Sequence, residues 1–208
     1  MKEAITSLLL IALAQVAFGQ VLAPNLQDES LWYLQNREVS KNYGNGVILN
    51  AAEGDGMMVL QDYTFNSGTI EFEVKGEDRQ GASFVGLAFN IQDDTEYETF
   101  YFRPFNFQNE DRKTHSVQYT YNPDFPWEVL RTKFPGKYEN LLDPAPDPNG
   151  WFHVRITIDK GQIKAFVNHQ TKPSLEVQSL SKNEDGKIGI WVGNGSKGEF
   201  RNLKITSH

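Results

Sequence analysis

The segment Glu96 to Arg103 carries a row of side chains that could hold a ligand. In an extended strand, alternate residues share a face. The residues that would share the polar face are Tyr97, Thr99, Tyr101 and Arg103. Aromatic rings can stack on the apolar face of a sugar, and arginine makes forked hydrogen bonds to oxygens. The row therefore predicts a sugar-binding face, with an ordinary exposed β face as the alternative because Tyr and Thr are common in strands.

Further candidates for ligand binding follow along the chain. We predict contacts from Tyr97, Tyr101, Arg103, Asn106, Gln118, Trp127 and Trp191. Trp127 could be a stacking platform at the rim of a groove or a plug that anchors a loop. If Ile190 and Val192 face the core, Trp191 faces outward, onto a ligand surface or under a covering loop.

Catalysis, if present, would centre on His115, Arg103 and Glu128. Histidine titrates near neutral pH and can act as base, acid or ligand, although a lone histidine at a strand start is more often structural. Glycosidases commonly need a pair of carboxylates. No Glu-x-Asp-x-x-Glu strand is present, and Glu71 and Glu73 are expected on a solvated face. We therefore favour binding over catalysis.

Metal motifs are weak in this sequence. It has no cysteine, no His-x-His or His-Glu-x-x-His spacing, and no Asp-x-Asp-x-Asp loop. Acidic side chains do gather in the turn at Asp93, Asp94 and Glu96 and in later loops. We predict no metal or other cofactor, with calcium as the alternative.

Alternation of apolar and polar residues predicts an all-β fold. We expect strands at 47–49, 57–60, 68–74, 83–89, 96–103, 115–121, 151–159, 162–168, 187–193 and 199–206. In the strand that begins at His115, Ser116 and Gln118 would share one face, and His115 and Tyr119 the other. Many short strands separated by turn signals are typical of a sandwich or barrel.

One long connection, 122–150, interrupts the strands. It holds six of the nine prolines, together with Phe125, Trp127, Phe134 and Tyr138. Disordered linkers are poor in aromatic residues, so we expect an ordered loop packed across the sandwich.

The N-terminus predicts export. Lys2, an apolar run and the small-x-small sequence Ala17-Phe18-Gly19 are typical of a signal peptide over 1–19, followed by one domain over 20–208. We therefore expect a secreted or periplasmic protein. Exported domains of eukaryotes commonly rely on disulfides, and this chain has no cysteine, so we expect a bacterial source.

The formal net charge of −7 argues against nucleic acid and anionic membrane surfaces as partners. We expect a neutral ligand or a cation and no membrane insertion, and the oligomeric state stays open.

Several segments resemble a known superfamily. Gly186–Gly193 and Gly198–Ile205 resemble the closing strands of concanavalin A-like lectin and glucanase domains, and Phe65–Val74 resembles their early strand. Trp151–Ile156 with Val167-Asn168 resembles their Trp-x-x-Val-x-Ile … Val-Asn hairpin. Over roughly 61–205 the chain is similar to laminin-G-like modules, laminarinase-type glucanases and the keto-disaccharide hydrolase family.

The resemblance implies a two-sheet antiparallel jelly-roll sandwich in which the early strand pairs with the last. It also implies a ligand on the concave face, an oligosaccharide or polysaccharide in the binding members, and a polar site able to hold a metal in the keto-disaccharide hydrolases. We expect a carbohydrate-binding, lectin-like module. The alternatives are a secreted hydrolase acting on a sugar derivative and a structural or protein-interaction domain.

Overall fold

The computed structural model describes residues 19–208. The expected signal peptide concerns residues 1–19 and, except for Gly19, lies outside the described residues. Within 19–208, no helix is both long and apolar enough to cross a membrane.

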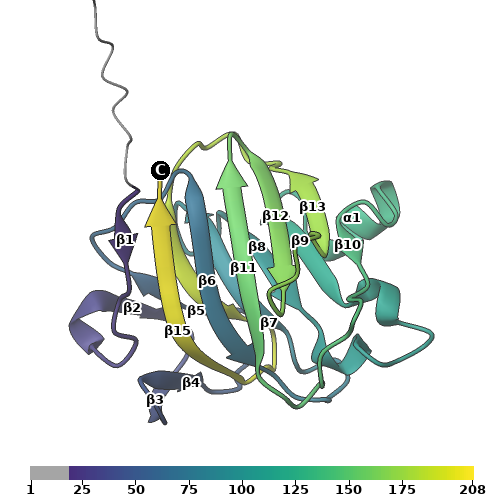
Figure 1. Cartoon of the computed structure of the whole chain (residues 1–208), viewed down its shortest axis with the longest axis horizontal. Coiled ribbons are helices and arrows are strands. Elements are labelled where there is room, and N and C mark those ends of the chain that lie inside the picture. The colour runs from purple at the N-terminus through teal and green to yellow at the C-terminus, as the bar shows by residue number, and fades with distance from the viewer. Residues whose placement is uncertain (1–18) are drawn as a thin grey trace, which may run out of the picture.

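Two antiparallel sheets pack face to face, so the prediction of an all-β jelly-roll sandwich is confirmed (Figure 1). The first sheet contains, in spatial order, β13 (Leu175–Gln178), β12 (Gln162–Val167), β11 (Phe152–Asp159), β6 (Gly68–Lys75), β15 (Gly198–Ser207), β4 (Gly46–Leu49) and β3 (Val39–Asn42), and β1 (Val21–Leu22) also pairs with β15.

The second sheet has seven strands. Their spatial order is β10 (Glu139–Asn140), β9 (Val117–Asn122), β8 (Tyr97–Phe102), β7 (Val85–Ile91), β14 (Lys187–Val192), β5 (Gly56–Leu60) and β2 (Trp32–Gln35). The helical elements are α1 (Trp127–Lys133) and the 3-10 turns η1 (Glu29–Leu31), η2 (Pro104–Asn106) and η3 (Lys113–His115).

Alternating side chains build the core between the sheets. In β6, Ile70, Phe72 and Val74 are buried, whereas Glu71 and Glu73 between them are partly exposed. The two glutamates form ion pairs on the outer face, which matches the solvated role expected for them. The second sheet contributes the inward residues of β7 and β8 to the same core. Burial of this apolar surface is the main term that favours folding.

The early strand pairs with the last strand, as the resemblance implied. In Figure 1, β6 and β15 lie side by side in the front sheet. Ile70 is opposite Ile205 and Glu71 is opposite Lys204, with a bulge between Arg201 and Lys204. The pairing places an early strand beside the last strand in the interior of the sheet.

Several elements differ from the sequence-based expectations. The connection 122–150 is ordered, but it also contains α1 and β10. The strand expected at 115–121 begins at Val117, and His115 ends the 3-10 turn η3 instead. The prediction that His115 and Tyr119 share a strand face is therefore wrong. The short strands β1, β2, β3, β10 and β13 were not expected, because two to four residues give little alternation.

The second sheet is unusual because its outer face also carries buried apolar side chains. A second cluster of seven buried residues, packed with Phe84, lies there: Met57, Val59, Ala88, Ile91, Tyr97, Tyr101 and Trp191. Gly86 makes this packing possible, since it lies opposite Tyr101 on one side and Trp191 on the other. A Cβ atom at position 86 would lie 2.2 Å from the carbonyl oxygen of Phe100 and 2.6 Å from the Tyr101 Cα.

Gly86→Ala should therefore displace Tyr101 and lower the free energy of unfolding by about 1–3 kcal/mol, the usual cost of overpacking. Chemical denaturation measures the loss, and near-ultraviolet circular dichroism should report the altered Tyr101–Trp191 contact. Gly81→Ala is the control, because a Cβ there meets nothing within 4 Å and carries only the cost of a φ of 74°. Unchanged stability and spectrum in Gly86→Ala would contradict this account of the site.

Candidate functional site

A row of side chains crosses the outer face of the second sheet in register. Gln118 on β9 is opposite Tyr101 on β8, Tyr101 is opposite Gly86, and Gly86 is opposite Trp191 on β14. Because Gly86 has no side chain, the rings of Tyr101 and Trp191 approach across it to a centroid distance of 5.1 Å. Phe84 packs edge-on against Tyr101 at 6.1 Å. The sheet thus presents an aromatic floor.

A pocket of about 260 Å³ opens over this floor, and we call it the site pocket. Its aromatic wall consists of Phe84, Tyr101, Trp127 and Trp191. Its polar wall consists of Asp55, Thr120, Asn122, Glu128 and Asn194. Apolar walls with a few placed polar groups are typical of ligand sites.

Asp55 lies at the turn that precedes β5. Its carboxylate accepts a hydrogen bond of 3.0 Å from the Tyr97 hydroxyl. Burial raises the pKa of Asp55, and the Tyr97 hydrogen bond and the Arg37 charge only partly oppose this shift. Burial and the nearby Asp55 carboxylate also raise the pKa of Tyr97, so Tyr97 remains a neutral donor. Asp55 is therefore a carboxyl group poised to exchange a proton.

Arg37 holds the loops around Asp55 in place. Its buried guanidinium donates to the carbonyl oxygens of Gly54 at 2.7 Å and Gly193 at 3.0 Å. Burial lowers the pKa of Arg37, while the charge of Asp55 raises it. One side chain thus fixes two loops that contribute to the pocket wall.

Arg103 lies beneath the pocket and acts on it through Tyr101. Its Nη2 donates to the Tyr101 hydroxyl oxygen at 2.7 Å, and both Nη atoms lie 3.3 Å from Gln118 Oε1. Burial raises the pKa of Tyr101 to about 12, although the Arg103 charge opposes the shift. Because the phenol oxygen accepts from Arg103, the phenol proton can be donated to a ligand oxygen.

Helix α1 is tied to the sheet by a charge cluster. Arg131 on α1 donates to Glu139 on β10 from Nε at 3.0 Å and from Nη2 at 2.6 Å. His115 Nδ1 lies 2.8 Å from Glu139 Oε2, at an angle unsuited to a regular hydrogen bond, and Arg103 Nη1 lies 4.0 Å away. Burial raises the pKa of Glu139, but the hydrogen bonds from Arg131 and the close contact with His115 outweigh this effect and lower the pKa overall.

Trp127 is positioned by the same cluster. The Arg131 guanidinium carbon lies 4.7 Å from the Trp127 ring centroid, and that of Arg103 lies 5.9 Å from it. Such cation–π contacts orient an indole ring. Trp127 is still 40% exposed, so its ring is both anchored and available at the pocket rim.

The structure brings most of the sequence-predicted residues together. Tyr101, Trp127, Trp191 and Glu128 line the site pocket. Tyr97 and Arg103 lie behind it and contact Asp55 and Tyr101, respectively.

Three further predicted residues do not line the site pocket. Gln118 is fully buried and holds Arg103, and Asn106 donates to the His115 carbonyl oxygen, which Arg103 also uses. The His115 side chain lies against Glu139. Their arrangement is that of a support for Arg103 and Glu139, and direct ligand contacts from them stay predictions.

Sequence reasoning missed several pocket residues, above all Asp55 and Phe84. Asp55 stands between two glycines in a turn, and nothing in its local sequence distinguishes it from other acidic turn residues. Phe84 lies just before β7, where its outward direction depends on where the strand begins.

A metal does not fit the site pocket well. Among residues 19–208, no three side chains of the His, Cys, Asp and Glu types gather as metal ligands. The carboxylates lining the pocket are Asp55 and Glu128. Among the described residues, the pocket therefore offers two carboxylates, one fewer than the three His, Cys, Asp or Glu ligands of a typical zinc site.

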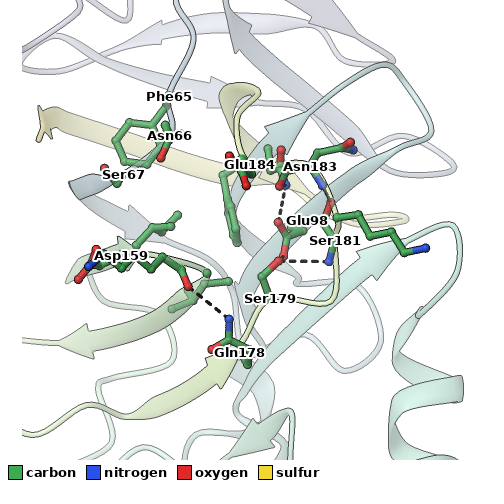
Figure 2. A pocket seen from close by; sticks show the side chains of 17 residues that line it. Phe65, Asn66, Ser67, Glu98, Asp159, Gln178, Ser179, Ser181, Asn183 and Glu184 are labelled. Carbon is green, nitrogen blue, oxygen red and sulfur yellow. Dashed lines mark hydrogen bonds between the residues drawn. The ribbon is translucent and has the colours of Figure 1, made fainter.

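A larger pocket of about 620 Å³ lies elsewhere, at one end of the sandwich (Figure 2). It shares no lining residue with the site pocket. None of the site residues predicted from the sequence lines it.

The sequence matches the model of the 3-keto-alpha-glucoside-1,2-lyase-like domain over residues 25–206. The chain belongs to this family. Membership confirms the predicted resemblance to the keto-disaccharide hydrolases within the concanavalin A-like superfamily. No curated protein matches the sequence significantly.

Solved structures of this superfamily are similar in fold. The carbohydrate binding module CBM66 from Bacillus subtilis has a TM-score of 0.63 at 14% identity, covering 84% of this chain and 95% of that one. The Bacillus licheniformis β-glucanase has a TM-score of 0.59 at 14% identity, with 93% and 100% covered. The VIP36 exoplasmic/lumenal domain, in its Ca²⁺/Man3GlcNAc-bound form, has a TM-score of 0.60 at 11% identity, with 89% and 86% covered.

Arg131→Ala should free Trp127, because the ring loses its cation–π contact. It should also lower the free energy of unfolding by about 2 kcal/mol at neutral pH, because Glu139 loses the arginine that binds both of its oxygens. The difference in free energy of unfolding between the variant and the unsubstituted protein should become smaller as the pH falls below about 4.3, the ordinary pKa of glutamate. The folded-state pKa of Glu139 is lowered, so its stabilising effect is present above that ordinary value and is lost on protonation.

Thermal unfolding against pH and tryptophan fluorescence measure these effects. Lys133→Ala, an exposed position on the same helix, is the matched control and should change neither. Equal effects of the two substitutions would show that the Arg131–Glu139 pair does not anchor α1.

Proposed function

We propose that the site pocket binds one sugar unit of an oligosaccharide or polysaccharide. The observation that carries this proposal is the combination of an aromatic wall with two carboxyl groups and two amide side chains in one small pocket. Sugar rings have apolar faces that suit aromatic stacking and hydroxyl edges that suit such polar groups. At about 260 Å³ the pocket lies below the roughly 300–1,000 Å³ usual for drug-sized ligands. It therefore suits a single sugar unit.

The polar groups of the site pocket can bind sugar hydroxyls both as hydrogen-bond acceptors and as donors. Asp55 accepts hydrogen bonds, and the Tyr101 hydroxyl donates because Arg103 occupies its oxygen. Trp191 Nε1 is buried, and within residues 19–208 it makes no hydrogen bond of normal geometry. It still lies close enough to the Tyr97 hydroxyl to lower the pKa of Tyr97.

Structural neighbours support this proposal through their described roles. One is a carbohydrate binding module, and another was solved with Man3GlcNAc bound. We also propose, from the N-terminal pattern of residues 1–19, that the protein meets its ligand after export.

Trp191→Phe should weaken sugar binding about tenfold, equivalent to about 1.4 kcal/mol. Tryptophan fluorescence of residues 20–208, titrated with oligosaccharides in the presence and absence of a chelator, measures the affinity. Trp151→Phe is the matched control, because Trp151 stacks on Arg201 from the first sheet and does not line the site pocket. A flat response of the unsubstituted protein to every glycan would reject the proposal and favour a protein-interaction domain.

A second candidate function is elimination from a 3-keto-glucoside, and the family match together with Asp55 favours it. In a 1,2-elimination, the base removes the proton from C2, which the neighbouring C3 ketone makes acidic. The C2–H electrons form the C1=C2 double bond, and the C1–O bond breaks with its electron pair. The departing oxygen gains a proton and leaves as an alcohol.

Residues of this chain can supply the parts that this reaction needs. Asp55 would be the base, and its raised pKa makes it a stronger one than an ordinary carboxylate. Tyr101 would donate its proton as a hydrogen bond to the ketone oxygen, where negative charge develops. Glu128, at the pocket rim, is the candidate acid for the leaving oxygen.

Asp55→Asn should then reduce turnover of methyl 3-keto-α-glucoside by at least about a hundredfold, while binding seen by fluorescence persists. The rate of the unsubstituted protein should fall as pH drops through the raised pKa of Asp55, because only the carboxylate removes a proton. Ultraviolet absorbance of the conjugated enone product measures turnover.

Glu53→Gln, an exposed position two residues earlier, is the control and should retain full activity. Undiminished turnover in Asp55→Asn would exclude Asp55 as the base. Saturable binding with the sugar recovered intact would exclude elimination and leave the binding function.

A further inference from the structure

The larger pocket lies where the two sheets part at one end of the sandwich, and we call it the end pocket (Figure 2). Its walls come from 65–67 before β6, from the start of β8, from the β11–β12 hairpin and from 178–184 after β13. Its volume of about 620 Å³ falls inside the roughly 300–1,000 Å³ range of small-molecule sites.

One wall is an irregular segment that side chains hold firmly in place. Ser179 Oγ donates to Glu98 Oε1 at 2.7 Å, and the Leu180 backbone N–H donates to the Tyr119 hydroxyl at 2.9 Å. Further along, Asn90 Nδ2 donates to the Asn183 carbonyl oxygen at 2.9 Å, and Asn183 Nδ2 donates to Glu96 at 2.7 Å. This wall is therefore preorganised, which reduces the entropy cost of binding.

Glu98 forms the inner end of the pocket. It is only 2% exposed and accepts hydrogen bonds from the Tyr119 hydroxyl, Ser179 and Asn90. No cationic side chain within residues 19–208 pairs with it. Burial raises the pKa of Glu98, although the three hydrogen bonds oppose this. Three neutral donors thus already satisfy the Glu98 carboxyl group, so it does not require a cationic ligand.

The rim carries polar side chains that lack partners within the described chain. Asn66, Asp159, Lys182 and Glu184 make no side-chain hydrogen bond or ion pair within residues 19–208. The rim charges balance, because Lys160 and Lys182 accompany Asp159 and Glu184. The apolar part of the lining includes Phe65, Phe89, Ile158 and Ile163, all of which are buried.

We propose that the end pocket is a second binding site, separate from the site pocket, for a neutral hydroxylated ligand of mono- or disaccharide size. Its apolar lining residues suit the carbon face of a sugar ring, and its amide and hydroxyl groups and balanced rim charges suit the hydroxyl edges. The site is independent of the proposed function, because the second sheet separates the two pockets. Glu98 points into the core side of β8, and Thr99 and Tyr101 point to the opposite face.

Two kinds of NMR signal distinguish the two pockets in one sample. Ile158 and Ile163 line the end pocket and no isoleucine lines the site pocket, whereas Trp127 and Trp191 line the site pocket and no tryptophan lines the end pocket. The protein labelled at isoleucine δ1 methyl groups and at indole nitrogens is titrated with glucose, maltose and, as a cationic comparison, glucosamine. We expect saturable shifts of the Ile158 and Ile163 methyl signals with glucose or maltose.

Substitutions at the rim test where the ligand lies. Asn66→Ala and Glu184→Gln should each weaken the methyl-detected affinity at least fivefold, without moving the indole-detected affinity. Lys172→Ala, an exposed position outside both pockets, should change neither. Methyl shifts with glucosamine alone, or no methyl shift with any of these sugars, would overturn the proposal. Indole shifts without methyl shifts would also overturn it and would leave the proposed function intact.

Discussion

The buried guanidinium of Arg103 is the interaction on which the site depends. Burial lowers its pKa, so keeping it charged requires partners on every side. It finds them in the Tyr101 hydroxyl, the Gln118 amide and the His115 carbonyl oxygen, with the Glu139 carboxylate 4.0 Å away. These contacts link β8, β9, η3 and β10, and through Glu139 they reach α1. The floor and the rim of the site pocket therefore share one charged centre.

The second sheet is packed on both faces, and this distinguishes it from the first. In the first sheet, the outward residues of β6 and β11 are partly exposed and many are charged. In the second sheet, β8 is buried along its whole length, with Phe100 and Phe102 inward and Tyr97 and Tyr101 outward. Aromatic residues with a polar end suit such a face, because they pack like core residues and still offer a hydroxyl group. The sheet can therefore be both a structural layer and a recognition surface.

Alternation predicted most of this arrangement from the sequence. It placed Tyr97, Tyr101 and Arg103 on one face of a strand and sent Trp191 outward, because a period of two leaves no other choice. It could not place Asp55, whose role depends on β5 lying beside β14, a pairing between distant segments. Helix α1 was also missed, since its seven residues are too few to show a helical period between prolines. The local sequence pattern thus determines which face of a strand a residue occupies. The pairing of distant strands determines which of these residues come together in the site.

Arg37 illustrates how a chain without cysteine can cross-link distant segments. Its guanidinium joins the turn at Gly54 to Gly193 after β14, more than a hundred residues apart, through hydrogen bonds to carbonyl oxygens. A disulfide at such a place would open or close with the redox potential of its surroundings. Hydrogen bonds from a guanidinium group do not depend on the redox potential. The rim around Asp55 should therefore keep the same shape in reducing and oxidising media, so the shape of the site pocket does not depend on redox conditions.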